Sequence, residues 1–390
     1  MLANKRINIK YRILVLIILA TLFFTSNLYG ENTMRPLYTL NRALMKKLLP
    51  EIYPTKKNEI VGIFDFPVDN AIATNMLPGT NAVTLISFDE KKLKVKYKTI
   101  AKNFKDYVGG GETSYLPIFS EDIIGYSQTR GFNLLNIRTK KNNYYSIVGD
   151  TNYEIMDNIV INSENKIFLF DIDIMKSEVT QSLLRIMDLS RKKAQIISEK
   201  IIHGNIYIKN SESTIFFLND NEIKATDINL KEVDHPFVQI FNKEKDRFKE
   251  ITELIIHPNL PFAVFNDDEK EEMWMISWRE DDIKNDKFLI KILGSESYSY
   301  QLSYDGKWLQ FDNFKEFIIM PVNPDLPYFL GKPILLGEIP RYPSGKGVTA
   351  MTRNPSGFVI TERQRDGLKK INILKKWDFT EAEKLIEKPE

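Results

Sequence analysis

Several short apolar segments of this chain are each followed at once by side chains that carry carboxylate or amide oxygens. Oxygens of this kind suit hard cations and basic peptide segments. If the preceding segments are equivalent strands, we expect these groups to share one mildly acidic face that binds a cation or a basic partner segment. A turn-forming role is the alternative, because Asp and Asn side chains bond nearby backbone where strands end. The carboxylates concerned are Asp171, Asp220, Asp267, Asp268, Asp312 and Glu362.

The familiar sequence patterns of metal, phosphate and nucleophile sites are missing from the chain. His203, His235 and His257 show neither an His-x-His nor an His-Glu-x-x-His spacing, so a structural role is expected for each. The triple glycine at 109–111 lacks the Lys-Ser/Thr of a phosphate loop, and Ser344 lies outside a Gly-x-Ser-x-Gly motif. The sequence therefore predicts no catalytic residue and no cofactor, with a structural or bound cation as the alternative.

The segments that would position the carboxylates recur along the chain. The clearest copy runs from Leu302 to Phe311, where an Asp-Gly turn precedes Trp308 and an alternating strand. Spacings between the last residues of successive copies are 52, 44, 47, 48, 46 and 49 by subtraction. Repeats of roughly 40–50 residues with four short strands are typical of β-propeller blades. These last residues are Thr74, Tyr126, Phe170, Phe217, Phe265, Phe311 and Ile360.

The repeat predicts an all-β, seven-bladed β-propeller at residues 59–379. A propeller of six or eight blades and an irregular β-sandwich are the alternatives. The residues from Leu93 to Ile100 alternate in polarity, which is typical of an outer strand with one wet face.

The segment Ser303-Tyr304-Asp305-Gly306-Lys307-Trp308 resembles the Ser-Pro-Asp-Gly-Lys-Trp signature of TolB-like, WD40-like β-propeller repeats. The resemblance covers roughly residues 59–379. It departs from the family where the proline of the motif is Tyr304, and Ser163 in the second-best copy. The resemblance implies the propeller fold. It does not imply a place in the Tol–Pal envelope system, because the segment before Glu59 is too short for the separate α/β domain that TolB carries.

Residues 1–30 have the order of a secretory signal peptide. A basic start with Lys5, Arg6, Lys10 and Arg12 precedes an apolar run of 12 residues at 13–24. This run is short for crossing a bilayer, which takes about 20 residues, and an uncleaved anchor is the alternative. The chain has no cysteine, so it can carry neither a disulfide nor a lipid-modified N-terminal cysteine.

Removal of this segment changes the formal charge from +2 to 2 − 4 = −2. A nearly neutral chain argues against nucleic acid as a partner, which usually requires a basic patch. Residues 31–58 are predicted as a lead-in with a short amphipathic helix that uses Leu40, Leu44, Leu48 and Leu49 and ends at Pro50 and Pro54. Residues 380–390 are predicted as a charged tail.

The function expected from these features is that of an exported binding or scaffolding module in the cell envelope, periplasmic, extracellular or membrane-anchored. Its partner would be a protein or another envelope component, with membrane contact only through an uncleaved N-terminal segment. The alternative is a propeller-based enzyme of the lyase, lactonase or glycosidase type, whose carboxylates would converge at the central channel.

Overall fold

The computed structural model spans residues 1–390, and the chain divides into two compact units, Met1–Pro36 and Leu37–Glu390. The structure describes residues 34–54, 63–68, 71–75, 83–101, 115–116, 123–128, 131–136, 139–146, 153–155, 159–161, 166–169, 172–174, 181–188, 195–203, 205–209, 214–219, 222–227, 229–294, 299–303, 305–313, 315–338, 341–342, 345–346, 349–353, 356–366 and 369–386.

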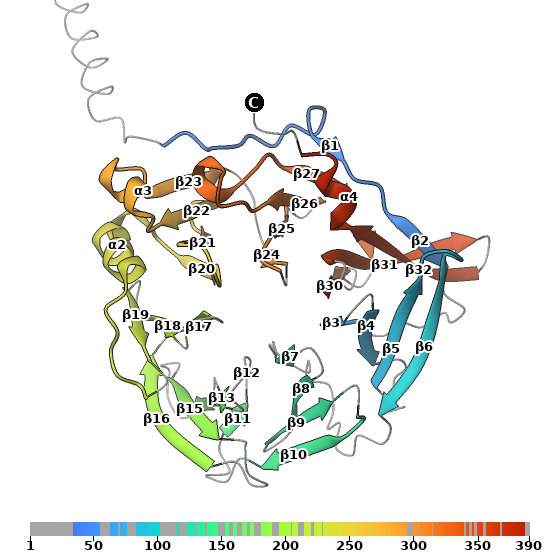
Figure 1. Ribbon diagram of the computed structural model, residues 1–390, viewed down its shortest axis with the longest axis horizontal. Coiled ribbons are helices and arrows are strands. Elements are labelled where there is room, and N and C mark those ends of the chain that lie inside the picture. The colour runs from blue at the N-terminus through green and yellow to red at the C-terminus, as the bar shows by residue number, and fades with distance from the viewer. Residues whose placement is uncertain are drawn as a thin grey trace, which may run out of the picture. The chain divides into compact units, whose positions relative to one another are not determined.

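The unit Leu37–Glu390 is mostly β, and its strands form several small antiparallel sheets (Figure 1). Sheet 1 contains β3 (Ile63–Val68), β4 (Ala71–Asn75), β5 (Val83–Asp89) and β6 (Lys94–Ala101). Sheet 2 contains β7 (Tyr115–Leu116), β8 (Ile123–Gln128), β9 (Gly131–Asn136) and β10 (Asn142–Ser146). Sheet 3 contains β12 (Ile159–Ile161), β13 (Lys166–Leu169), β15 (Gln181–Asp188) and β16 (Gln195–His203). Sheet 4 contains β17 (Asn205–Lys209), β18 (Thr214–Asn219) and β19 (Glu222–Thr226).

Sheet 5 contains β20 (Ile251–Ile256), β21 (Phe262–Asp267), β22 (Glu272–Ser277) and β23 (Leu289–Leu293). Sheet 6 contains β24 (Ser299–Leu302), β25 (Trp308–Asp312), β26 (Glu316–Pro321) and β27 (Ile334–Glu338), with β1 (Lys46–Lys47) parallel to β27. Sheet 7 contains β30 (Thr349–Arg353), β31 (Ser356–Asp366) and β32 (Lys369–Asp378), with β2 (Glu51–Pro54) outside β32. Two-stranded pairs join β11 (Tyr153–Ile155) to β14 (Ile172–Ile174) and β28 (Arg341–Tyr342) to β29 (Gly345–Lys346).

Helical segments are few and short in the described residues. The longest is α2 (Pro236–Glu244), which the 3-10 turn Lys245–Arg247 follows. The others are α3 (Glu280–Lys284), a 3-10 turn at Pro327–Phe329 and α4 (Phe379–Glu383). The charged tail predicted from residue 380 onward therefore begins inside α4, where Phe379 and Ala382 are fully buried.

Several neighbouring sheets contact one another through their first strands. In unit Leu37–Glu390, β7 contacts β12, β17 contacts β20, and β20 contacts β24. The first strand of sheet 7 also contacts the first strand of sheet 1, because β30 packs beside β3. Meander sheets that follow one another in this way, with the last against the first, are the organisation of a propeller-type fold.

The residues that mark the sequence repeat lie in equivalent strands. Each falls on the second strand of a different sheet, with the exception of Phe170, which directly follows β13 and lies outside the described residues. The prediction that the copies are equivalent second strands is therefore confirmed at six marks: Thr74 in β4, Tyr126 in β8, Phe217 in β18, Phe265 in β21, Phe311 in β25 and Ile360 in β31.

Core residues of the described part lie between the sheets. One cluster joins sheets 5 and 6 and includes Met275 and Ile318. A second joins sheets 6 and 7 and includes Ile319 and Trp377. A third joins sheets 7 and 1 and includes Tyr53, which is fully buried. Burial of apolar side chains between sheets is thus what holds the sheets together.

The prediction of a short amphipathic helix in the lead-in is wrong. Residues 34–54 contain no helix and instead supply β1 and β2. Leu44 and Leu49, which were expected on its apolar face, are 81% and 74% exposed, whereas Leu48 is buried. Apart from one turn, in which Leu44 and Met45 donate to the carbonyl of Asn41, the backbone of this segment bonds to the sheet edges. Tertiary pairing therefore overrides a short local pattern.

Candidate functional site

The predicted acidic residues of sheet 5 lie at the end of β21. Asp267 is fully buried, and its two carboxylate oxygens accept the backbone N–H groups of Lys249 (3.1 Å) and Glu250 (3.2 Å). Its neighbour Asp268 is exposed. Asp267 therefore holds the segment that enters β20 against the end of β21. This is a structural role, but the two N–H groups lie 18 and 17 residues earlier in the chain and not in the turn that follows β21.

The remaining predicted carboxylates occupy different surroundings. Asp312 ends β25 of sheet 6, at the place that corresponds to the end of β21, and it is 6% exposed. Glu362 lies within β31 and forms an ion pair with Lys375 of the adjacent strand β32. Asp171 and Asp220 lie outside the described residues. The acidic face as a whole stays a prediction.

Replacing Asp267 by alanine is expected to lower the free energy of unfolding by about 1–3 kcal/mol, because two backbone donors lose their acceptor. Urea unfolding followed by fluorescence measures the change. The matched control is Asp268→Ala, one residue further on and exposed, for which a change within about 0.5 kcal/mol is expected. Equal effects at both positions would contradict the structural role of Asp267.

His257 joins sheet 5 to sheet 6. Its ring Nδ1 accepts the backbone N–H groups of Asn259 (3.1 Å) and Leu260 (2.8 Å). With Nδ1 acting as acceptor, Nε2 carries the proton and donates to the carbonyl oxygen of Gly306 at 2.9 Å. The ring is 3% exposed. This arrangement uses both nitrogens for structure, as expected from the sequence.

The Asp-Gly turn of sheet 6 is built around that contact. Gly306 has φ +72°, and a Cβ placed on it would lie 2.9 Å from Nε2 of His257. Within the turn, Ser303 Oγ donates to Asp305 (2.6 Å) and accepts the backbone N–H of Trp308 (2.9 Å). His257 and Ser303 hold the same place in their sheets. The backbone N–H of each donates to the carbonyl oxygen five residues later in the chain, at 3.0 Å for His257 and 2.7 Å for Ser303.

Sheet 4 carries a helix where its neighbours carry a fourth strand. The side-chain amide of Asn242 in α2 accepts from the backbone N–H of Ile223 (2.9 Å) and donates to its carbonyl (2.8 Å). Asn242 thus bonds the edge strand β19 as another strand would. Phe237 and Phe241 of α2 are fully buried, and His235 caps the helix by accepting the N–H of Phe237. This helix was not predicted from the sequence, because its Phe residues also fit a strand.

The segment 37–54, here called the strap, runs along the outer edges of three sheets (Figure 1). Leu37 and Tyr38 donate their N–H groups to carbonyls of β23 in sheet 5 (2.8 and 3.1 Å). Further on, β1 pairs with sheet 6 and β2 with sheet 7. The N-terminal strand β2 is therefore the outermost strand of the sheet formed by the C-terminal part of the chain.

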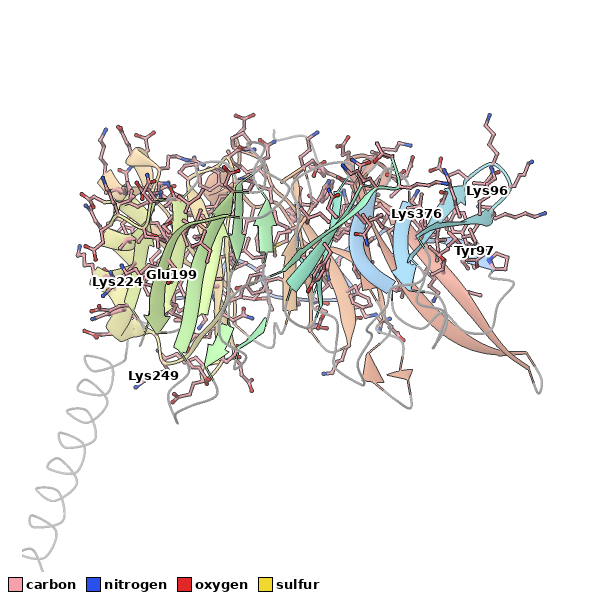
Figure 2. All side chains as sticks on the ribbon, turned by 90° about the horizontal axis from the view of Figure 1, so that it is seen from below. Lys96, Tyr97, Glu199, Lys224, Lys249 and Lys376 are labelled. Carbon is pink, nitrogen blue, oxygen red and sulfur yellow. The ribbon has the colours of Figure 1, made fainter. Side chains whose placement is uncertain are left out.

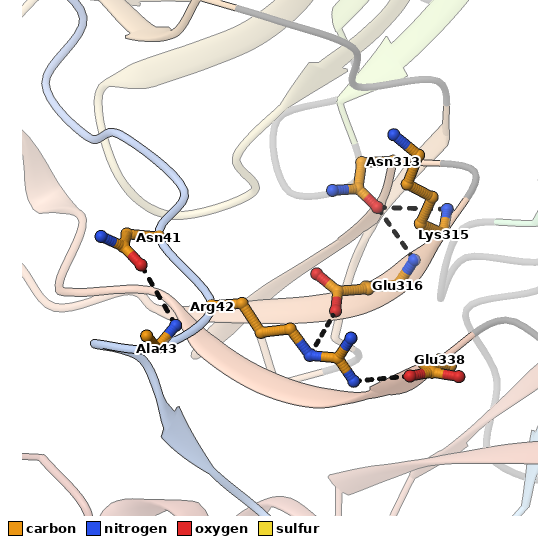
Figure 3. A network of polar contacts seen from close by, with 7 residues as sticks. All are labelled: Asn41, Arg42, Ala43, Asn313, Lys315, Glu316 and Glu338. Carbon is orange, nitrogen blue, oxygen red and sulfur yellow. Dashed lines mark hydrogen bonds and ion pairs between the residues drawn. The ribbon is translucent and has the colours of Figure 1, made fainter.

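Arg42 fixes the strap to sheet 6 (Figure 3). Its guanidinium contacts Glu316 of β26 at 3.0 Å and Glu338 of β27 at 2.5 Å. The hydrogen bond to Glu338 is the main cause of the raised pKa of Arg42. Because the side chains of Arg42 and Glu338 are 57% and 67% exposed, solvent screening keeps the contribution of this pair to stability small.

A buried lysine side chain, that of Lys376, lies at the seam where sheets 7 and 1 pack together (Figure 2). Lys376 of β32 is fully buried and forms an ion pair with Glu90 at 3.1 Å, and its Nζ lies 5.5 Å from the ring centre of Phe88. Tyr53 of β2 packs edge-on against the same ring, and burial raises the pKa of its phenol. Residues from both ends of the chain thus meet at this seam.

No group of three or more His, Cys, Asp or Glu side chains in the described ranges is placed to hold a metal ion. Within those same ranges, no helix has the length and apolar character that crossing a bilayer requires.

No protein-family model matches the chain, and no curated protein matches it. Solved structures similar to it include the AfRom2 CNH domain (TM-score 0.47, 11% identity, covering 85% of this chain and 98% of that one). Hsv2 of Kluyveromyces lactis is similar at TM-score 0.46 and 10% identity, covering 81% and 97%. The tricorn protease is similar at TM-score 0.40 and 12% identity, covering 80% of this chain and 34% of that one. These similarities carry no argument about function.

Proposed function

We propose that residues 59–379 form a seven-bladed propeller of TolB-like repeats, and that the exported chain serves as a binding or scaffolding module in the cell envelope. The observation that carries the proposal is the placement of the repeat marks on the second strands of separate sheets. Such a scaffold is rigid, whereas its connecting loops are free to vary and to bind.

Two of the predicted carboxylates already have partners within the protein, which favours the binding role over the enzyme role. Asp267 already accepts two backbone N–H groups, and Glu362 is already paired with Lys375. Catalytic carboxylates have to reach a substrate in a shared cavity. Export is supported by the composition of residues 1–30, and the acidic face around Asp268 remains part of the proposal as the surface for a cation or a basic segment.

Export is tested by determining which residue is the first of the mature chain when the protein is made in its own cells. Intact-mass and N-terminal peptide spectra of the envelope fraction are expected to show a chain that begins near Glu31, after Gly30. A chain that keeps residues 1–30 in the membrane fraction would replace the signal peptide with an anchor. A full-length chain found only in the soluble cell interior would overturn the proposal.

Binding is tested by quantitative capture from envelope extract. The chain is compared with a variant in which Asp171, Asp268 and Asp312 are all replaced by Asn. A partner on the acidic face is expected to be retained by the first chain and lost by the variant, provided both unfold at the same urea concentration. Equal recovery of every retained component would remove the acidic face. Turnover of candidate sugar or lactone substrates by the chain would support the enzyme instead.

A further inference from the structure

The hairpin that joins β5 to β6 in sheet 1 is rich in lysine. Residues 89–98 contain five lysines and two acids, so their formal charge is 5 − 2 = +3. Both acids have partners, since Asp89 forms an ion pair with Lys96 at 3.1 Å and Glu90 with the buried Lys376 of sheet 7 at 3.1 Å. All five lysines are exposed: Lys91, Lys92, Lys94, Lys96 and Lys98. The hairpin therefore presents a cationic surface to solvent.

Three of these lysines form a row on one face of β6. Lys94, Lys96 and Lys98 alternate with Val95 and Tyr97, which pack against the core cluster between sheets 7 and 1. Lys96 and Tyr97, both labelled in Figure 2, therefore lie on opposite faces of the strand. Alternate residues of a strand are about 7 Å apart, so the row is about 14 Å long. Because β6 is the outer strand of sheet 1, the row lies at the outer edge of that sheet.

An exposed leucine lies at the tip of the same hairpin, in a backbone conformation that suits glycine. Leu93 is 46% exposed and has φ +46°, which residues with a Cβ rarely adopt. The hairpin β21–β22 has a connection of the same length, residues 268–271 against residues 90–93. Its fourth residue, Glu271, has φ +53° and is charged. An exposed side chain adds little to the core, and glycine serves such a turn better, so neither packing nor the turn explains the leucine.

Lysines around a single exposed leucine favour the surface of an anionic bilayer as the partner. Lipid phosphates attract lysine, and the apolar boundary beneath the headgroups accepts a leucine side chain. A soluble polyanion would leave Leu93 in water. Protein interfaces are usually enriched in aromatic residues and arginine and depleted of lysine, whereas lysine is the only cation of residues 89–98.

We propose that the β5–β6 hairpin docks on an anionic lipid bilayer, with Leu93 entering the headgroup region and the lysines of the hairpin contacting lipid phosphates. This contact uses residues outside the apolar run at 13–24. It is also independent of the acidic face described under the proposed function, because sheet 1 holds none of the carboxylates of that face. Salt screens such a contact, so binding is expected to weaken as ionic strength rises.

The test places one environment-sensitive fluorophore on the full chain, which has no cysteine of its own. Leu93→Cys carries the fluorophore at the tip, and Glu271→Cys carries it at the equivalent position of the hairpin β21–β22 as the matched control. Vesicles of phosphatidylglycerol and phosphatidylcholine in equal parts are expected to shift the emission of the first to shorter wavelength and to leave the second unchanged. With phosphatidylcholine alone, at least about tenfold more lipid is expected to be needed for the same shift.

A second pair of variants, each labelled at position 93, tests the charges. One replaces the lysines of the tip by glutamine: Lys91→Gln, Lys92→Gln and Lys94→Gln. The control replaces exposed lysines in connections of sheets 5 and 6: Lys284→Gln, Lys287→Gln and Lys315→Gln. The first is expected to need at least about tenfold more anionic lipid for half of the shift, and the control is expected to match the unchanged charges. Equal effects of the two triples at equal urea midpoints, or no shift at position 93, would overturn the proposal.

Leu93→Gly separates binding from folding. Glycine adopts a positive φ without steric cost, so the urea midpoint of this variant is expected to equal or exceed that of the unchanged chain. A lower midpoint would show that Leu93 serves the fold and would overturn its proposed role. Heparin, a soluble polyanion, is expected to leave the fluorophore at position 93 unshifted. A shift as large as that with vesicles would overturn the bilayer in favour of a soluble polyanion.

Discussion

Replacing Trp377 by alanine is expected to lower the free energy of unfolding by about 3–5 kcal/mol, the usual cost of removing a buried tryptophan side chain. Trp377 is 1% exposed and packs between sheets 6 and 7. Its indole N–H donates to two carbonyl oxygens, that of Leu48 in the strap (3.1 Å) and that of Leu336 in β27 (3.0 Å). One side chain therefore connects the strap and both sheets.

Graded variants separate the packing of Trp377 from its hydrogen bonds. Trp377→Phe keeps an aromatic ring but removes the N–H donor, so a smaller loss of about 1–3 kcal/mol is expected. Leu44→Ala in the strap is the control, because Leu44 is 81% exposed and its truncation should change stability by less than about 0.5 kcal/mol. Urea unfolding measures all three. If the alanine variant were as stable as the control, the strap would not depend on Trp377.

Replacing His257 by alanine is expected to lower the free energy of unfolding by about 2–3 kcal/mol. The change leaves the N–H groups of Asn259 and Leu260 without their acceptor and the carbonyl of Gly306 without its donor. Gly306→Ala is expected to cost about 1–2 kcal/mol through its positive φ alone, and more through the contact of its Cβ with the His257 ring.

The two sites are expected to be coupled. Removing the His257 ring relieves the contact made by Ala at position 306, so the double variant should lose at least about 0.5 kcal/mol less than the sum of the single variants. A double-mutant cycle in urea measures this difference. Gly331→Ala provides a comparison, because its Cβ would instead meet Pro321, and its effect should add to that of His257→Ala. Additive losses at His257 and Gly306 would contradict the contact between the sheets.

The phase of the repeat could be predicted from sequence because it depends on local chemistry. A short polar turn followed by an apolar strand recurs in the copies, and Ser303 and His257 do hold equivalent turn positions. The roles of the carboxylates could not be predicted, because the same residue types end strands and bind ligands. Asp267 accepts from the backbone of residues 249–250, which directly precede β20 and lie 17 or 18 residues away along the chain.

The lead-in shows the limit of local pattern most clearly. Leucines at helical spacing predicted a helix at 40–49, but the structure places this segment along the edges of three sheets. Nothing in the spacing of the lysines singled out Lys376, which is buried against Phe88 and Glu90. Its partners lie 286 residues or more away along the chain, so only folding brings them together.

By itself, the sequence determined the strand-rich class, the length of the repeat and the turns within each copy, because these follow from side chains close together in the chain. Only the tertiary structure decided which segments cover the sheet edges. The strap and α2 occupy those edges because the backbone groups of distant strands need hydrogen-bond partners. A local sequence pattern does not indicate which segment will supply these partners.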